Sequence, residues 1–344
     1  MSRQSSLMSQ EIAETGAILA RQLAANDAAT RQIAALIAKR DPRLVATIAR
    51  GSSDHAALYL KYLIEIALGV PCASIGPSIA SLYDAPLRLE GALAITISQS
   101  GRSPDIVALQ DAANRAGALT LALVNDVDSP AARAAQCLLP LHAGPERSVA
   151  ATKSMIAALV AGAALIGQWV GDEKLSAAIL RLPALLSGAA APPPPALIDL
   201  IVGAKSAFVL GRGSTFAIAA EAALKLKETC AIHAEAFSSA EVLHGPAGVI
   251  TPGFLIIAFM PADAAREGMS ETLARLAAMG ANVVVVDAAA SPDKSALVVP
   301  AADHPLLTPI VMLHRFYAIV EASATALGRD PDNPPHLRKV TETI

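Results

Sequence analysis

The sequence predicts an α/β protein of two domains, each built on a parallel β-sheet flanked by helices. Its 344 residues suffice for about two domains of ordinary size. Short apolar runs without polar alternation are separated by helical stretches, which is typical of strands buried on both faces of a parallel sheet. Residues 50–53 (RGSS) and 212–215 (RGST) each lie between an apolar run and a helix, which indicates an internal duplication.

The composition narrows the class of protein further. Hydrophobic residues make up 53 % of the chain, charged residues 17 % and aromatic residues 3 %. This excludes an intrinsically disordered chain, which needs low hydrophobicity and high charge. The 27 Lys and Arg against 30 Asp and Glu give a formal charge of −3, without the basic excess that binds nucleic acid or anionic membranes. We therefore expect neither partner.

Cysteine usage and the N-terminus predict a cytoplasmic protein. Cys72, Cys137 and Cys230 are odd in number and far apart, which argues against a disulfide framework or a zinc site. The first residues, MSRQSSLMSQEIAET, lack the apolar core of a signal peptide. The apolar run 154–171 approaches the length of a membrane span, but it is rich in Ala and Gly and contains Gln168. We expect a buried core helix there.

The first half of the chain starts with a predicted N-terminal helical segment, residues 1–40, in which apolar spacing favours a single helix over 8–39. The first domain is predicted over 41–188. Its strands are expected at 44–49, 92–97, 119–124 and 137–141, and its helices at 54–68 and 105–116. Gly69 suits the end of the first of these helices.

Four consecutive prolines, residues 192–195, favour a stiff extended linker over 189–196. The second domain is predicted over 197–328, with strands at 207–211, 254–260 and 282–287 and helices at 216–230, 264–279 and 306–327. The stretch from His233 to Pro246 is polar and predicted to be irregular. The polar tail 329–344 is too hydrophilic to add a core element, so we expect it to be disordered or to fold over a site.

The loop 98–104 (SQSGRSP) is the strongest candidate for ligand binding. Ligands of open parallel sheets bind beyond the carboxyl ends of the strands, where this loop lies. Ser103 suits the N-cap and Pro104 the first helical turn, and a helix N-terminus favours phosphate. The loop lacks the spacing of nucleotide-binding motifs, so a small phosphorylated molecule is favoured over a nucleotide. A capped surface loop without ligand is the alternative.

A second candidate cluster surrounds Lys225 and Glu228, which share a helix face. Spacing alone favours an exposed ion pair; the alternative is a carboxylate aimed at a pocket as a general base. Glu241 and His244 could form part of a metal site, but no third ligand follows at a recognisable spacing, and we expect no metal. Structural or solvent roles are expected for His304, His314, Asp303 and Arg315, whereas His55 and His142 border the candidate loops and are ambiguous.

Several motifs together resemble the sugar isomerase (SIS) domains, and more narrowly the isomerase half of glucosamine-6-phosphate synthase. They are the two Gly-Ser loops, ISQSG, HAGPE followed by ATK, ALKLKE, HAEAF and the Glu-x-x-His-Gly-Pro run. The resemblance covers roughly residues 45–344 and includes the Leu-Arg-Lys of the tail. It implies two tandem SIS domains, each a flavodoxin-like three-layer sandwich, with the tail 329–344 over the active site.

The resemblance also implies residue roles. It assigns the sugar phosphate to the side chains of Ser53, Ser98, Gln99, Ser100 and Ser103. It assigns Val149 a backbone contact to the sugar, and Glu228 the base that moves a proton between C1 and C2. It makes His244 the ring-opening acid/base, donated across a homodimer interface. It makes Lys339 an imine-forming lysine, and it places Lys225 near the substrate hydroxyls or the base.

Two departures from the synthase matter. Only about 40 residues precede the first predicted strand, and none is the cysteine of a glutaminase domain. We therefore expect the reverse reaction, deamination of glucosamine-6-phosphate to fructose-6-phosphate and ammonia, without a cofactor. Arg102 replaces an acidic residue and is expected to affect sugar preference. The alternatives are a deglycase, a ketose–aldose isomerase of another amino sugar phosphate, or a non-catalytic phosphosugar sensor.

Overall fold

The computed structural model describes residues 5–187, 192–289 and 296–339. These residues form two compact units, each built around one sheet. The N-unit comprises the described residues within 15–146, 153–183 and 338–339. The C-unit comprises those within 5–14, 147–152 and 184–337. The chain therefore passes between the units several times, and the first helix belongs to the C-unit.

The N-unit contains a five-stranded parallel sheet in the order β2-β1-β3-β4-β5. Its strands are β1 (Val45–Ile48), β2 (Cys72–Ser74), β3 (Leu93–Ser98), β4 (Leu119–Val124) and β5 (Cys137–Pro140). The order 2-1-3-4-5 is that of flavodoxin-like doubly wound folds, in which ligands bind at the switch point between the first and third strands. The sheet confirms the predicted parallel α/β fold, and it places residues 98–103 at this switch point.

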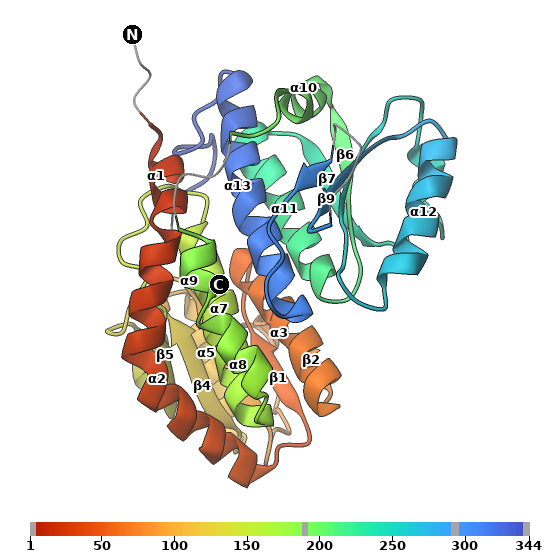
Figure 1. Ribbon diagram of the computed structural model, residues 1–344. Coiled ribbons are helices and arrows are strands. Elements are labelled where there is room, and N and C mark those ends of the chain that lie inside the picture. The colour runs from red at the N-terminus through yellow and green to blue at the C-terminus, as the bar shows by residue number, and fades with distance from the viewer. Residues whose placement is uncertain (1–4, 188–191, 290–295, 340–344) are drawn as a thin grey trace. The chain divides into compact units, whose positions relative to one another are not determined.

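Helices cover both faces of this sheet, as Figure 1 shows. Ala46, Ile48 and Ala94 point to one face and pack against α5 (Pro104–Arg115), while α6 (Pro130–Ala134) covers β4 on that face. On the other side the sheet contacts α2 (Thr15–Arg40), α3 (Ser52–Leu68) and α7 (Lys153–Val170). The unit is completed by the short helices α4 (Ser78–Ser81), α8 (Glu173–Ile179) and α9 (Leu182–Leu185), the last of which ends in the C-unit.

Helix α7 is the only described helix that is long and apolar enough to cross a membrane. In this structure 78 % of its residues, over Lys153–Val170, are buried. It packs against α2 and α3, and a Cβ on Gly162 would lie 2.4 Å from Leu60 Cδ1, so the two helix backbones approach closely there. These contacts are those of a core helix, as the sequence predicted.

The C-unit repeats the topology of the N-unit. Its parallel sheet has the order β10-β9-β8-β6-β7, which is again 2-1-3-4-5 when the strands are numbered along the chain. The strands are β6 (Ser206–Gly211), β7 (His233–Ser238), β8 (Leu255–Phe259), β9 (Asn282–Asp287) and β10 (Leu297–Val298). On one face lies α12 (Arg266–Ala278), and on the other lie α11 (Ser214–Cys230) and α13 (Thr308–Ala326).

The two Gly-Ser loops have the same geometry. Gly51 has φ 57° and ψ −133°, and Gly213 has φ 59° and ψ −135°. Each precedes a helix of 17 residues, α3 and α11. A positive φ is accessible to glycine at little cost, so both loops require glycine at this position for the same reason. This agreement supports the duplication indicated by the sequence.

Some predicted elements differ from the observed ones. The helix predicted over 8–39 is wrong in detail, since it is divided at Glu14 into α1 (Leu7–Ala13) and α2. The stretch predicted to be irregular contains β7, an edge strand whose polar residues hid it. The short strands β2 and β10 were also missed. Helix α10 (Pro195–Gly203) begins at the last proline, and residues 189–191 of the expected linker lie outside the described residues.

Candidate active site

The loop between β3 and α5 is folded by its own hydroxyl groups. Ser98 Oγ accepts a hydrogen bond from the Gly101 N–H (3.0 Å), and Ser100 Oγ accepts one from the Arg102 N–H (3.3 Å). Ser103 stands at the N-cap and Pro104 begins the helix, as predicted. Within the described residues, Ser103 makes no side-chain capping bond, so its hydroxyl can turn to a ligand. The loop has the donors and the helix end that a phosphate needs.

Gly101 fixes this loop against the neighbouring helix α6. Its φ is +61°, and a Cβ at this position would lie 2.2 Å from Ser129 Oγ. The Gly101 carbonyl also accepts a hydrogen bond from the Ala131 N–H at 3.1 Å. Glycine is therefore required both by conformation and by space, and the loop is held in place by backbone contact.

Two arginines neutralise carboxylates around the loop. Arg50, before the Gly-Ser loop, forms an ion pair of 2.5 Å with the fully buried Asp105 in the first turn of α5. Arg102 contacts Asp126 through Nε (3.0 Å) and Nη2 (2.6 Å), and this hydrogen bond lowers the pKa of Asp126. Both pairs reduce the negative potential that these carboxylates would place near a bound phosphate.

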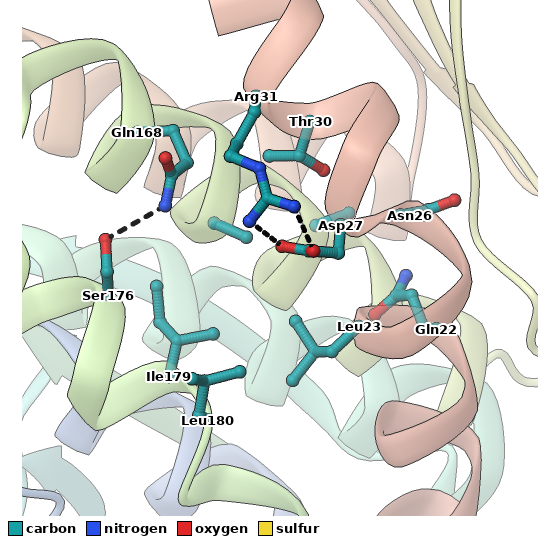
Figure 2. Close-up of a pocket in the computed structure, with 12 residues that line it drawn as sticks. Gln22, Leu23, Asn26, Asp27, Thr30, Arg31, Gln168, Ser176, Ile179 and Leu180 are labelled. Carbon is teal, nitrogen blue, oxygen red and sulfur yellow. Dashed lines mark hydrogen bonds and ion pairs between the residues drawn. The ribbon is translucent and has the colours of Figure 1, made fainter.

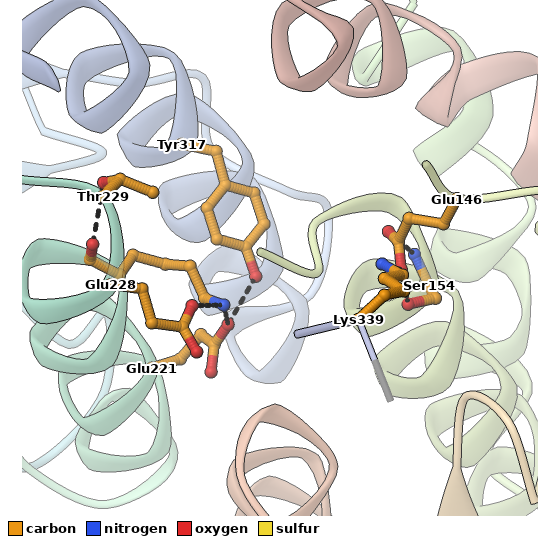
Figure 3. Close-up of polar contacts among 8 residues, drawn as sticks. Glu146, Ser154, Glu221, Glu228, Thr229, Tyr317 and Lys339 are labelled. Atoms are coloured by element: carbon orange, nitrogen blue, oxygen red, sulfur yellow. Dashed lines mark hydrogen bonds and ion pairs between the residues drawn. The ribbon is translucent and has the colours of Figure 1, made fainter. Parts of the chain in front are cut away.

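A buried charge cluster lies on α11 in the C-unit. Lys225 has no exposed surface; its Nζ contacts the Glu228 carboxylate and lies 3.5 Å from Glu221 Oε1. Tyr317 of α13 donates a hydrogen bond to Glu221 Oε1 at 3.1 Å (Figure 3). Glu228 keeps 21 % of its side chain exposed. The pair is therefore not the exposed ion pair that spacing alone favoured, and Glu228 is the member of the cluster that a small molecule can reach.

Glu221 and Tyr317 are the members of this cluster that sequence reasoning missed. Glu221, Lys225 and Glu228 are spaced i, i+4 and i+7, which places all three on one helix face. That spacing could have revealed Glu221. Tyr317 lies on another helix, and only the packing of α11 against α13 brings it to Glu221.

The tail lysine lies in a second polar cluster, within the N-unit. Lys339 Nζ is 3.3 Å from Glu146 Oε2, and the same oxygen accepts a hydrogen bond from Ser154 Oγ at 2.5 Å. Glu146 Oε1 accepts the Ser154 N–H at 3.1 Å (Figure 3). Glu146 is 6 % exposed, so its charge is compensated by these donors. Glu146 belongs to the HAGPE motif but was assigned no role from the sequence.

The remaining predicted site residues are placed as follows. Val149 is half-buried, and its N–H donates to the Asp332 carbonyl oxygen at 3.0 Å. His244 is exposed in the turn after β7. The predicted residues thus fall into two groups. The N-unit holds Ser53, Ser98, Gln99, Ser100, Ser103 and Lys339, and the C-unit holds Val149, Lys225, Glu228 and His244.

Two cavities lie away from these residues. One, of about 160 Å³, lies between α2, α7 and α8, with the Asp27–Arg31 ion pair at its wall (Figure 2). The other, of about 410 Å³, lies in the C-unit at the starts of β6, β8 and β9. Neither is lined by a predicted site residue. Among the described residues, no three His, Cys, Asp or Glu side chains are grouped to hold a metal ion.

Comparison with known proteins gives related chains over most of the sequence. A glutamine–fructose-6-phosphate aminotransferase (isomerizing) from Symbiobacterium thermophilum is 33 % identical over 315 residues, which cover 86 % of this chain and 51 % of the relative. The corresponding protein of Thermococcus kodakarensis is 31 % identical over 96 % of this chain and 57 % of its own length. The chain therefore spans about half the length of the curated relatives it matches.

Solved structures with the same fold are also found. One is a protein of Silicibacter pomeroyi DSS-3 that is named a phosphosugar isomerase. It has a TM-score of 0.89 and 44 % identity over 95 % of this chain and 100 % of its own. The C-terminal domain of the Francisella tularensis glucosamine-fructose-6-phosphate aminotransferase has a TM-score of 0.85 at 24 % identity, over 96 % of this chain and 99 % of that one. The SIS domain profile matches residues 38–167 and 200–326. With two matching segments and a repeated doubly wound sheet, the chain belongs to the SIS domain family.

Proposed function

We propose that this protein is an isomerising glucosamine-6-phosphate deaminase, which converts glucosamine-6-phosphate to fructose-6-phosphate and ammonia. The observation that carries the proposal is the buried Glu221–Lys225–Glu228 cluster, with Glu228 as its accessible carboxylate. The named activity of the aminotransferase relatives includes fructose-6-phosphate and an isomerisation. A SIS-domain protein with such a cluster is suited to move a proton between adjacent sugar carbons.

The phosphate is assigned to the switch-point loop of the N-unit. The side chains of Ser53, Ser98, Gln99, Ser100 and Ser103 and the N-terminus of α5 offer several donors to a dianion. The Arg50–Asp105 and Arg102–Asp126 pairs remove the repulsion of nearby carboxylates. This site binds any sugar 6-phosphate, so the identity of the sugar depends on other contacts, among them the backbone of Val149.

The proton transfer is assigned to Glu228. In the open-chain substrate, Glu228 takes the proton from C2 while the C1 oxygen gains a proton, which gives an enolamine. Glu228 then returns its proton to C1 while the amine nitrogen loses one, so no net proton is gained or lost. The product carries an imine at C2, and water hydrolyses this imine to the ketone and ammonia. Lys225, fixed between two carboxylates, holds the Glu228 carboxylate in place and compensates its charge. These groups complete the reaction with water as the sole second reactant.

Two further roles are part of the proposal. Lys339 forms an imine with the open-chain ketose product, and Glu146, at 3.3 Å, receives the proton that the lysine must lose. One water leaves as this imine forms, and one water hydrolyses it to release the ketose. His244 is exposed, and we assign it to ring opening in the site of a partner subunit, so the active protein is a homodimer. We also assign the enzyme to the cytoplasm, as the compartment of a phosphorylated amino sugar substrate.

The test is release of ammonia and fructose-6-phosphate from glucosamine-6-phosphate by the purified protein. Glu228→Gln is expected to lose kcat by about 10²–10⁴-fold with little change in KM, because a general base is removed. Glu235→Gln, which removes an exposed carboxylate of β7 in the same unit, is the matched control. Full activity in Glu228→Gln, or glutamine-dependent synthesis of glucosamine-6-phosphate by this chain, would overturn the proposal.

Assays with several amino sugar phosphates distinguish the proposed deaminase from a deglycase, a ketose–aldose isomerase and a non-catalytic sensor. Galactosamine-6-phosphate and fructosamine-6-phosphates are assayed alongside glucosamine-6-phosphate, with Arg102→Glu compared to the natural protein. Faster turnover of another amino sugar phosphate would favour a deglycase or ketose–aldose isomerase. Binding of phosphosugars without turnover of any of them would favour a sensor.

A further inference from the structure

The first helix, α1, is built into the C-unit rather than continuing α2. Met8 is fully buried and Ile12 is 5 % exposed. The helix contacts α13, where His314 Nε2 lies 3.1 Å from the Ile12 carbonyl oxygen. Ser6 Oγ donates to Glu321 Oε1 at 2.7 Å. The short helix is therefore anchored by tertiary contacts along its length.

Asp332 of the C-terminal tail caps this helix from a distance in sequence. Its Oδ2 accepts the Leu7 N–H and its Oδ1 accepts the Met8 N–H, both at 2.8 Å. A carboxylate at a helix N-terminus satisfies free N–H groups and interacts favourably with the helix dipole. The main chain of the same residue accepts the Val149 N–H at 3.0 Å. Asp332 thus contacts α1 through its side chain and the loop 147–152 through its backbone.

Glu11 of α1 closes the set of contacts. Its carboxylate is 4 % exposed and accepts a hydrogen bond from the Arg147 N–H, at the start of the same loop. Three segments are therefore bonded pairwise: α1 to the tail, the tail to the loop, and the loop to α1. All of these contacts lie within the C-unit. We call this set of bonds, made by Glu11, Asp332, Arg147 and Val149, the brace.

We propose that the brace makes α1 a positioning element of the phosphosugar site, with Asp332 and Glu11 as its positioning residues. The inference rests on the proposed function, in which the Val149 main chain contacts the sugar. A peptide N–H that is bonded on one side fixes the direction of the peptide plane, and hence of the neighbouring carbonyl groups. Asp332 also anchors the tail segment that leads to Lys339. Asp332 therefore fixes the position of the Val149 main chain and of the tail segment that leads to Lys339.

The variants are Asp332→Asn, Glu11→Gln and their combination. Asparagine keeps the size of Asp332 but replaces one acceptor oxygen by an NH₂ group that cannot accept the helix N–H. Ser6→Ala is the control, because it weakens the attachment of α1 to α13 and its own N-cap without touching the loop or Asp332. Hydrogen exchange of the 147–152 amides gives a readout that does not need activity.

We expect Asp332→Asn and Glu11→Gln each to speed exchange of the Arg147 and Val149 amides and to raise KM for glucosamine-6-phosphate by about tenfold. The fold increase in KM and in exchange rate should be larger in the double variant than in either single variant. It should be smaller than the product of the two single increases, because the bonds act together. Inhibition by inorganic phosphate should be unchanged, since the phosphate loop belongs to the N-unit. Ser6→Ala should change neither exchange nor KM.

The outcomes are separable from those of the proposed function. Unchanged amide exchange in Asp332→Asn would overturn the brace even if the enzyme proves to be a deaminase. Faster exchange with unchanged KM would overturn the positioning role. Equal effects in Ser6→Ala would also overturn it, because the change would then be general loosening of α1. If the natural protein turns over no amino sugar phosphate, the proposed function fails, and amide exchange still decides whether the brace exists.

Discussion

Replacing Lys225 by methionine tests the charge cluster of α11 most directly. Methionine keeps the unbranched stem but removes the cation between Glu221 and Glu228. Because Lys225 is fully buried, water cannot replace the lost charge. The variant takes this cation away from the Glu221 carboxylate, which has no exposed side-chain surface and which also accepts a hydrogen bond from Tyr317.

The magnitude follows from the geometry. At 3.5 Å and an effective dielectric constant of about 20, the attraction between Lys225 and Glu221 is roughly 5 kcal/mol. Desolvation of both groups offsets part of this attraction, and removal of one partner of a buried pair typically costs about 3–5 kcal/mol. We therefore expect Lys225→Met to lower the free energy of unfolding by about 3–5 kcal/mol. Adding Glu221→Gln should restore part of the loss, since it removes a buried negative charge that Lys225 balances in the natural protein.

Urea unfolding followed by far-ultraviolet circular dichroism measures this loss. Fluorescence of Trp169, the single tryptophan, reports separately on the N-unit. Lys205→Met is the matched control, because Lys205 is an exposed lysine of the same unit and its loss should change stability by less than about 0.5 kcal/mol. The prediction would be refuted if the urea midpoint of Lys225→Met equalled that of Lys205→Met. Further destabilisation on adding Glu221→Gln would also refute it.

Gly101→Ala should raise both KM for glucosamine-6-phosphate and the inhibition constant of inorganic phosphate, because a Cβ would collide with Ser129 Oγ and displace the loop; steady-state kinetics check this, and Gly248→Ala, which places a Cβ in open space, is the control. Burial lowers the pKa of His314 below its ordinary 6.5, so the folded protein binds fewer protons than the unfolded chain; stability should be full above about pH 6.5 and fall as the pH drops toward the lowered value. His314→Gln should flatten this dependence in thermal unfolding, and an unchanged slope would show that other groups cause it. Mixing inactive Glu228→Gln and His244→Ala subunits should restore part of the activity if His244 acts across a dimer interface. If His244 acts within its own chain, subunits that exchange should regain no activity.

Local sequence patterns were sufficient for most of the fold. The apolar runs that became β3, β4, β6 and β8 are continuous because both faces of these strands are buried, and such runs are visible without tertiary information. Strands β2 and β10 have only three and two residues, and β7 carries polar residues such as His233 and Glu235, so these three edge strands gave no comparable signal. The N-cap and first turn of α5 were readable because capping depends on adjacent residues.

The sequence by itself determined the two α/β repeats, the loop 98–104 with the helix start that follows it, and the helix face that carries Lys225 and Glu228. The tertiary structure decided which of these charges are buried and what they contact. Glu221 meets Tyr317 only because α11 packs on α13, and Asp332 caps α1 across more than three hundred residues of sequence. Helical spacing fixes which residues share a face, but burial and partners depend on the segments that fold onto that face, and no local pattern encodes them.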